Sequence, residues 1–218
     1  MFINFWYPVE ESAKLLDQPL HRRMLGQDFV LFRDSQGVAR CLSNVCVHRG
    51  GSLAHGKLKG DCIECPYHGW QFDGAGRCTH VPSLGSGQKP PKRAKVDAYP
   101  TVEKYGLVFA FLGDLPAEER PPIIDIPEWD RDGWRPTTDI FEWEFNYQRS
   151  IENGIDTAHN EFTHTTHIGA SSGKNYVPEF EQSNTEWGVE LNYVAPGKAA
   201  SSEGILGIAE GKTEDGPT

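Results

Sequence analysis

The sequence predicts an α+β protein in which an all-β first part is followed by a part that mixes strands with a helix. Its 218 residues include 23 Gly and 15 Pro, a content typical of chains with many short strands and turns. Before residue 113, apolar runs such as FVLFRD, VARCLSN and YGLVFAFLG alternate with turn residues, and a helix is expected only at 10–17. Four prolines at 113–127 then indicate a linker.

Charge divides the chain at nearly the same place. Residues 1–112 hold 14 Lys/Arg and 10 Asp/Glu, a net charge of +4, whereas residues 113–218 hold 7 and 21, a net charge of −14. We therefore expect two domains, 1–115 and 116–218. The total charge of −10 argues against nucleic acid as a partner.

The second part is predicted to contain one helix among strands. TTDIFEWEFNYQ, at 137–148, is typical of a strand. SIENGIDTAHNEF, at 150–162, predicts a helix because its apolar residues form one stripe at helical spacing. After residue 169 the chain is polar and rich in Gly and Ser, with two weak strands expected.

The expected location is the cytoplasm. No apolar run reaches membrane-spanning length, and the first residues lack the basic and apolar regions of a secretion signal. The five cysteines all lie between Cys41 and Cys78, beside histidines. An odd number of cysteines in one segment indicates metal binding more than a disulfide framework.

Two pairs of Cys and His, Cys46-Val-His48 and Cys65-Pro-Tyr-His68, are separated by sixteen residues. Thiolates hold ferric iron, and two neutral imidazoles at one iron raise the potential of a [2Fe–2S] cluster far above that of an all-cysteine cluster. Glycines next to both pairs suit tight loops. These four residues are therefore the candidate cluster ligands.

Zinc is the competing interpretation, because two Cys and two His also make a structural zinc site. The C-x-H spacing is tighter than the usual zinc spacing, and the flanking residues resemble loops more than the helix of a zinc finger. The remaining cysteines, Cys41, Cys62 and Cys78, are expected to be small buried strand residues.

The segments NVCVHRGGSL and CIECPYHGWQFDGAGRC closely resemble the Rieske motif of the ring-hydroxylating and demethylating oxygenases. KRAKVDAYPTVEKYGLVFAFLGD resembles the segment that closes their Rieske domain. NFWYPVEESAKL is similar to the start of the single-subunit type, which includes vanillate, dicamba and methylxanthine demethylases. The resemblance implies an all-β Rieske [2Fe–2S] domain followed by the N-terminal part of an α+β catalytic domain with a large antiparallel sheet.

A second constellation, Asn153-x2-Asp156-x2-His159-x4-His164, lies on the predicted helix. Asn153, Asp156 and His159 are three residues apart and would project within one arc, whereas His164 would lie far round an ideal helix. Both histidines could reach one metal only if the helix ended or bulged between them. From the residues alone, the alternative is that these histidines and His167 are surface polar residues after a helix.

ENGIDTAHNEFTH resembles the mononuclear iron motif of the same oxygenases. The resemblance implies that His159 and His164 bind a mononuclear Fe(II), that Asp156 bridges to the histidine ligand of a Rieske cluster in a neighbouring subunit, and that Asn153 supports the site. His167 is off the pattern. The carboxylate ligand of the family should follow far downstream, and the glutamates at 179, 181, 186 and 190 match no motif, so the chain is expected to be a fragment or a truncation.

The resemblance also implies partners and a reaction. A ferredoxin or reductase would supply electrons, and O2 would be used to hydroxylate or O-/N-demethylate a small aromatic substrate in a homotrimer. Monooxygenation or demethylation is favoured over dihydroxylation. The alternatives are an aromatic-ring dioxygenase alpha subunit and a Rieske ferredoxin-like carrier without catalysis, which would not need residues 114–218.

Overall fold

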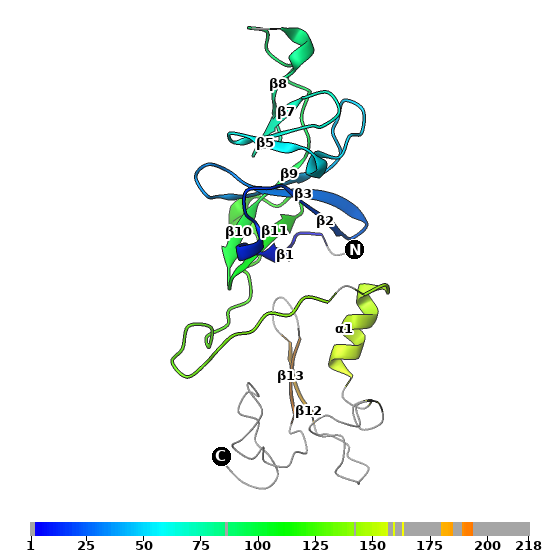
Figure 1. Ribbon diagram of the computed structural model, residues 1–218. Helices are drawn as coiled ribbons and strands as arrows, with labels where there is room; N and C mark the ends of the chain where they lie inside the picture. Colours follow the sequence, from blue (N-terminus) through cyan, green and yellow to red (C-terminus); the bar gives the residue numbers. More distant parts are fainter. Residues whose placement is uncertain are drawn as a thin grey trace. The chain divides into compact units, whose positions relative to one another are not determined.

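The structure is a computed structural model that describes residues 3–85, 87–141, 143–156, 159, 163, 180–184 and 189–193 (Figure 1). The chain divides into two compact units, Met1–Asp125 and Ile126–Thr218. The predicted domain boundary at 115/116 stays a prediction. None of the helices in the described part of the chain has the length and apolarity that a bilayer crossing needs.

In the first unit, the described strands form three antiparallel sheets. The first sheet has the order β1-β11-β10, the second β2-β3-β4-β9 and the third β5-β6-β7-β8. The strands are β1 (Phe5–Glu11), β2 (Leu20–Met24), β3 (Gln27–Arg33), β4 (Ala39–Ser43), β5 (Lys57–Lys59), β6 (Cys62–Glu64), β7 (Gln71–Asp73), β8 (Cys78–His80), β9 (Ala98–Tyr99), β10 (Thr101–Lys104) and β11 (Leu107–Leu112). Four 3-10 turns connect them or follow them: η1 (Ser12–Lys14), η2 (Leu53–His55), η3 (Pro82–Leu84) and η4 (Ala117–Glu119).

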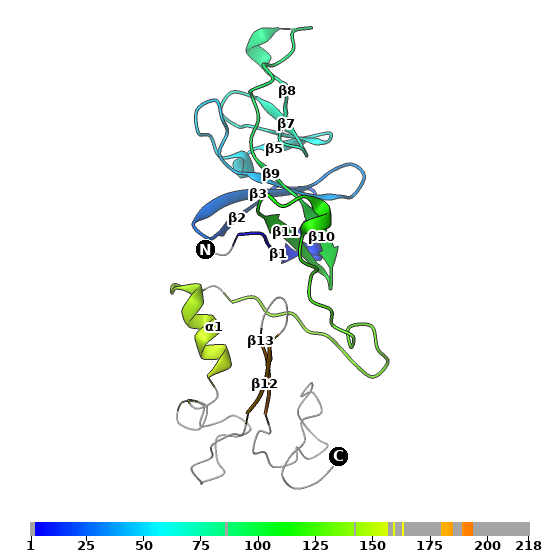
Figure 2. The same cartoon turned by 180° about the vertical axis from the view of Figure 1, so that it is seen from behind.

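Strand β3 lies between two hydrophobic cores, which explains its continuous apolar run. Alternate residues of a strand point to opposite faces, and here Phe29 and Leu31 enter one core while Val30 and Phe32 enter the other. A strand buried on both faces carries apolar residues at every position instead of alternating. Figure 2 shows β3 between the β5–β8 sheet and the sheet of β1, β10 and β11.

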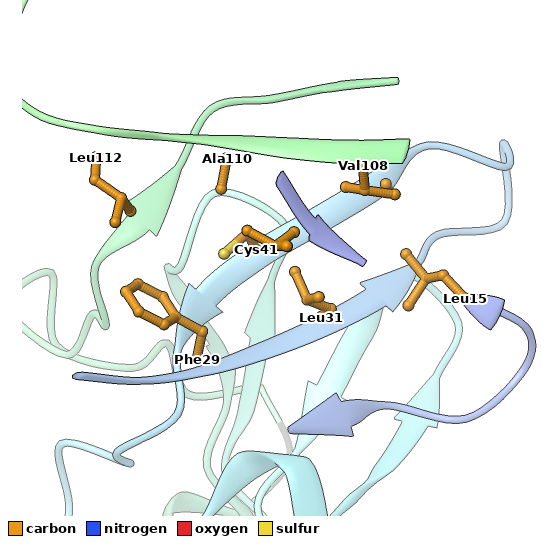
Figure 3. Close-up of a cluster of buried hydrophobic side chains, with 9 residues drawn as sticks. Leu15, Phe29, Leu31, Cys41, Val108, Ala110 and Leu112 are labelled. Carbon is orange, nitrogen blue, oxygen red and sulfur yellow. The ribbon is translucent and has the colours of Figure 1, made fainter. Parts of the chain in front are cut away.

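The first core joins β3 and β4 to the two ends of this unit (Figure 3). Leu31 and Cys41 face Val108 and Ala110, which come from β11 near the end of the unit. The buried members are Val9, Leu15, Phe29, Leu31, Ala39, Cys41, Val108, Ala110 and Leu112. This core therefore closes the unit by bringing β11 back to β1.

The second core carries the two cysteines of the Rieske-like motif. Cys46 and Cys65 are both 2% exposed and pack with Phe72 and Ile63, which are fully buried. The buried members are Val30, Phe32, Leu42, Cys46, Leu53, Ile63, Cys65, Phe72 and Val96. The rigid packing of this core is what positions the two cysteine sulfurs.

The second unit contains helix α1 (Tyr147–Ile155) and an antiparallel pair, β12 (Phe180–Asn184) and β13 (Val189–Tyr193). The pair confirms the two strands expected after residue 169. The strand predicted at 137–148 is wrong: residues 137–141 and 143–146 form no strand, and Asn146 caps α1 by accepting a hydrogen bond from the Gln148 N–H.

Two helix predictions also need correction. The helix expected at 10–17 is wrong, because β1 continues to Glu11 and is followed only by the 3-10 turn η1. Helix α1 begins and ends earlier than the predicted range of 150–162, and Asp156, its C-cap, has an extended backbone. Asp156 and His159 therefore do not share a helical arc with Asn153.

Candidate metal centre

The first Cys-His loop, residues 44–52, follows β4 and closes on itself through its own backbone. The Cys46 N–H donates to the Gly51 carbonyl at 2.9 Å, and the Cys46 carbonyl accepts from the Gly50 N–H at 2.8 Å. Gly50 has a φ of +71°, a left-handed conformation that glycine adopts without strain. The glycine that follows the motif is therefore what allows this turn.

The second Cys-His loop, residues 65–70, joins β6 to β7 and repeats the same frame. The Cys65 N–H donates to the Trp70 carbonyl at 2.8 Å, and the Cys65 carbonyl accepts from the Gly69 N–H at 3.0 Å. Gly69 has a φ of +70°. Both loops are thus closed by the same pair of hydrogen bonds, although the histidine follows its cysteine by two residues in one and three in the other.

Asn44 holds the start of the first Cys-His loop and is one of the few buried polar residues of the first unit, at 6% exposed. Its side chain donates to the Ser52 Oγ at 3.0 Å and accepts from the Ala54 N–H at 2.7 Å. Its backbone N–H donates to the Asp28 carbonyl at 2.9 Å. The sequence reading missed this residue, because an Asn before a loop is usually an exposed turn residue.

The two loops approach each other at the cysteines. A Cβ atom added to Gly51 would lie 3.0 Å from the Cys65 Sγ and 3.3 Å from the Tyr67 Cβ, so only glycine fits between the loops without a shift. The side chain of Cys65 is near enough to Cys46 to raise the pKa of its thiol. The sulfur ligands predicted from two separate motifs therefore meet at one point.

The histidines meet on the outer side of the same point. The rings of His48 and His68 have centroids 4.5 Å apart with planes at 66°, and both residues are exposed. Trp70 stacks flat on His48, with centroids 4.5 Å apart and planes at 5°, while Tyr67 lies against His68 at 3.9 Å. The site has a buried sulfur side and an exposed imidazole side.

Their surroundings shift the pKa values of the candidate cysteine and histidine ligands Cys46 and His48 in opposite directions. Burial, with a smaller effect from Cys65, raises the pKa of the Cys46 thiol to about 11, although the backbone N–H groups of His48 and Arg49 act against this rise. Partial desolvation, then the positive charges of His68 and Arg49, lower the pKa of His48. A metal binds the thiolate and the neutral imidazole. The raised pKa of Cys46 therefore has to be overcome by the positive charge of a bound metal, whereas the lowered pKa of His48 favours the form that binds.

The other three cysteines lie on strands, outside the two Cys-His loops. Cys41 is buried in the first core, where burial raises the pKa of its thiol to about 12. Cys62, on β6, and Cys78, on β8, are half-buried. The prediction that these cysteines are buried strand residues is confirmed for Cys41. Cys62 and Cys78 do lie on strands, but they are only half-buried.

The second constellation is described only in part. Asn153 lies exposed on α1, and the His159 Nδ1 lies 3.6 Å from the Asp156 Oδ2. His164 and His167 lie outside the described residues. Over the described ranges, no three His, Cys, Asp or Glu side chains are placed to hold a single ion.

Comparison with known proteins gives matches over most of the chain. A model of the Rieske [2Fe–2S] domain matches residues 5–103. The iron–sulfur subunit of a toluene-4-sulfonate monooxygenase system of Comamonas testosteroni is 35% identical over 191 residues, which are 86% of this chain and 54% of that protein. The chloroplastic chlorophyllide a oxygenase of Chlamydomonas reinhardtii is 39% identical over 166 residues, 75% of this chain and 24% of that protein.

Among solved structures, dicamba monooxygenase with non-heme iron and dicamba is similar at a TM-score of 0.71 and 28% identity. The match covers 94% of this chain and 57% of that one. The chain thus spans about half the length of the first relatives that it matches. The expected fold class, a Rieske domain followed by part of an α+β domain, is confirmed by these matches.

Proposed function

This chain belongs to the Rieske oxygenase family, and we propose that Cys46, His48, Cys65 and His68 hold its [2Fe–2S] cluster. One observation carries the proposal: two loops with the same hydrogen-bond frame bring two buried thiols together and two histidines together. When bound, such a cluster supplies one-electron chemistry at a raised potential.

The residues around the cluster have separate tasks in this proposal. Cys46 and Cys65 give up their protons to bind, and the second core keeps water from their sulfurs. His48 and His68 bind as neutral imidazoles and present their exposed rings to whatever protein delivers or takes the electron. A cluster held by these residues would exchange electrons through its histidine side, because the cysteine side is buried and the histidines are exposed.

We further propose that the protein uses the electrons for O2-dependent oxygenation at a mononuclear Fe(II) on His159 and His164. Asn153 would support this site, and Asp156 would connect it to His68 of a neighbouring subunit. One support is the resemblance of ENGIDTAHNEFTH to the iron motif of these oxygenases. The other is that two similar proteins, the Comamonas protein and the dicamba protein, are named as monooxygenases. Hydroxylation or demethylation of a small aromatic compound is the corresponding reaction.

The proposed assembly is a homotrimer in the cytoplasm, with a ferredoxin or reductase as the electron donor. The opposite charges of residues 1–112 and 113–218 support head-to-tail contacts between copies, since contacts of this kind close into rings. Such contacts would weaken with salt.

Metal analysis of the purified chain tests the cluster proposal. We expect two iron atoms and two sulfides per chain, a reddish-brown colour and a reduction potential of about −150 to +300 mV, against about −400 mV for an all-cysteine plant-type cluster. Histidine ligation causes this rise by removing negative charge from one iron. Stoichiometric zinc without sulfide, after expression with ample iron, would show a zinc site in its place.

Anaerobic titration with Fe(II) tests the second metal. A longer form of the protein that carries the downstream carboxylate ligand is expected to bind one iron beyond its cluster. His159→Ala should abolish this additional iron while the cluster spectrum stays unchanged, since the cluster ligands are untouched. His167→Ala is the matched control and should keep the additional iron. If that longer form binds no iron beyond the cluster, the ferredoxin-like carrier is favoured.

A further inference from the structure

The ring of Trp70 belongs to one Cys-His loop but lies on the histidine of the other. The ring of Trp70 stacks on His48 with planes only 5° apart, whereas Trp70 itself ends the second loop. The same residue closes its own loop, because its backbone carbonyl accepts from the Cys65 N–H at 2.8 Å. Main chain and side chain of one residue thus contact both halves of the site.

Trp70 is held in place by the second core, whereas the ring of Tyr67 is not. It is half-buried and packs against the second core. Tyr67, the ring beside His68, is 63% exposed and tilted by 34°. A ring that packs against the core can restrict the rotation of the ring stacked on it. An exposed ring can move together with the ring that it contacts.

Such a restriction is important for His48 because its imidazole ring can rotate. The torsion that rotates the ring of histidine has broad, roughly two-fold preferences, so the backbone alone does not fix the ring plane. Histidine ligands usually have a second contact that sets their orientation. No hydrogen bond to the His48 ring occurs among those described, and the flat stack is the contact that restricts its rotation.

We propose that Trp70 is a positioning residue of the cluster site: its ring fixes the plane of His48, and its carbonyl fixes Cys65, so that the two loops keep one relative geometry. This inference rests on the proposed ligation by His48 and Cys65. It adds a residue that touches neither iron nor sulfur. The competing explanation is that Trp70 only fills space at the edge of the second core.

Two substitutions separate these explanations. Trp70→Phe keeps a smaller aromatic plane, and Trp70→Leu keeps an apolar side chain without a plane. Resistance of the bound iron to a competing chelator should fall in the order wild type, Trp70→Phe, Trp70→Leu. The loss at Trp70→Leu should be about tenfold, the size typical for contacts that orient metal ligands. The EPR signal of the reduced cluster should broaden in the same order, as the His48 ring takes up several orientations.

Trp6→Leu is the matched control. Trp6 is also half-buried in the first unit, but it packs on Phe111 at 5.3 Å and donates to the Pro121 carbonyl, away from the cysteines. It should lower thermal stability without changing the EPR signal or the chelator resistance. If it changes both as Trp70→Leu does, Trp70 has only a packing role.

The outcomes also separate this inference from the ligation on which it rests. A wild-type protein without a two-histidine cluster signal would contradict the ligation itself. A wild-type signal that is unchanged in Trp70→Leu would contradict only the role of Trp70. If Trp70→Leu does not fold, Trp70→Phe decides: chelator resistance equal to that of the wild type would overturn the inference, and lower resistance at unchanged thermal stability would support it.

Discussion

Cys46→Ser is expected to abolish the visible absorption and the EPR signal of the two-histidine cluster. Serine replaces the buried thiol of Cys46 with a hydroxyl. A hydroxyl ionises far less readily than a thiol and binds iron less well, and here it would also be buried, which disfavours its charged form further. We expect less than a tenth of the cluster to remain, measured as iron and sulfide per chain.

Cys41→Ser is the matched control for this experiment. Cys41 is 1% exposed and lies in the first core, so the same replacement buries the same hydroxyl at a similar depth. It should lower the free energy of unfolding by about 1–3 kcal/mol, the cost of an unpaired buried polar group. Its cluster content should stay at the wild-type level. Loss of the cluster in both variants would mean that general destabilisation, and not ligation, explains Cys46→Ser.

Phe72→Ala is expected to give the second largest effect, on stability and on the cluster together. The ring of Phe72 is fully buried in the second core, in the same cluster of side chains as Cys46 and Cys65. Removing such a ring costs about 3–5 kcal/mol, a large part of the 5–15 kcal/mol that stabilises a typical domain. The cavity would also let water reach the buried side of the sulfurs. Thermal unfolding and the rate of iron release should both change.

Phe29→Ala tests whether that effect is local. Phe29 is as buried as Phe72 but faces the first core from β3. Its replacement should lower thermal stability by a similar amount and leave iron release, measured well below the unfolding temperature, close to wild type. Equal iron release in the two variants would show that the cores do not act separately on the site.

The two Cys-His loops could be predicted from the sequence because two independent signals agree. The Cys and His residues recur in the same order, and glycines follow each pair where the structure has a φ near +70°. The apolar run FVLFRD likewise predicts a strand, and the structure has β3 there with both of its faces buried. In each case the requirement is local, so a short stretch of sequence contains all of it.

The remaining features depend on contacts that are distant in the sequence. Asn44 is important because Ser52 and Ala54 fold back onto it, and Trp70 because His48 of another loop lies on its ring. The alternation at 137–148 predicts a strand, but Asn146 caps a helix there. An alternating segment favours a strand, but a strand also needs a neighbouring strand with which to pair. Among the described residues, no strand pairs with this segment.

The two cores of the first unit differ in when a growing chain can complete them. Every buried member of the second core lies between Val30 and Val96, and the β5–β8 sheet pairs neighbours within a short stretch of chain. The first core needs β1 and β11, which pair Phe5 with Leu112. During synthesis from the N-terminus, all residues that surround Cys46 and Cys65 are therefore available before the strand that closes the unit. Short-range pairings form faster than long-range ones, so the cysteine pocket is expected to be ready for iron and sulfide before the ends of the unit meet.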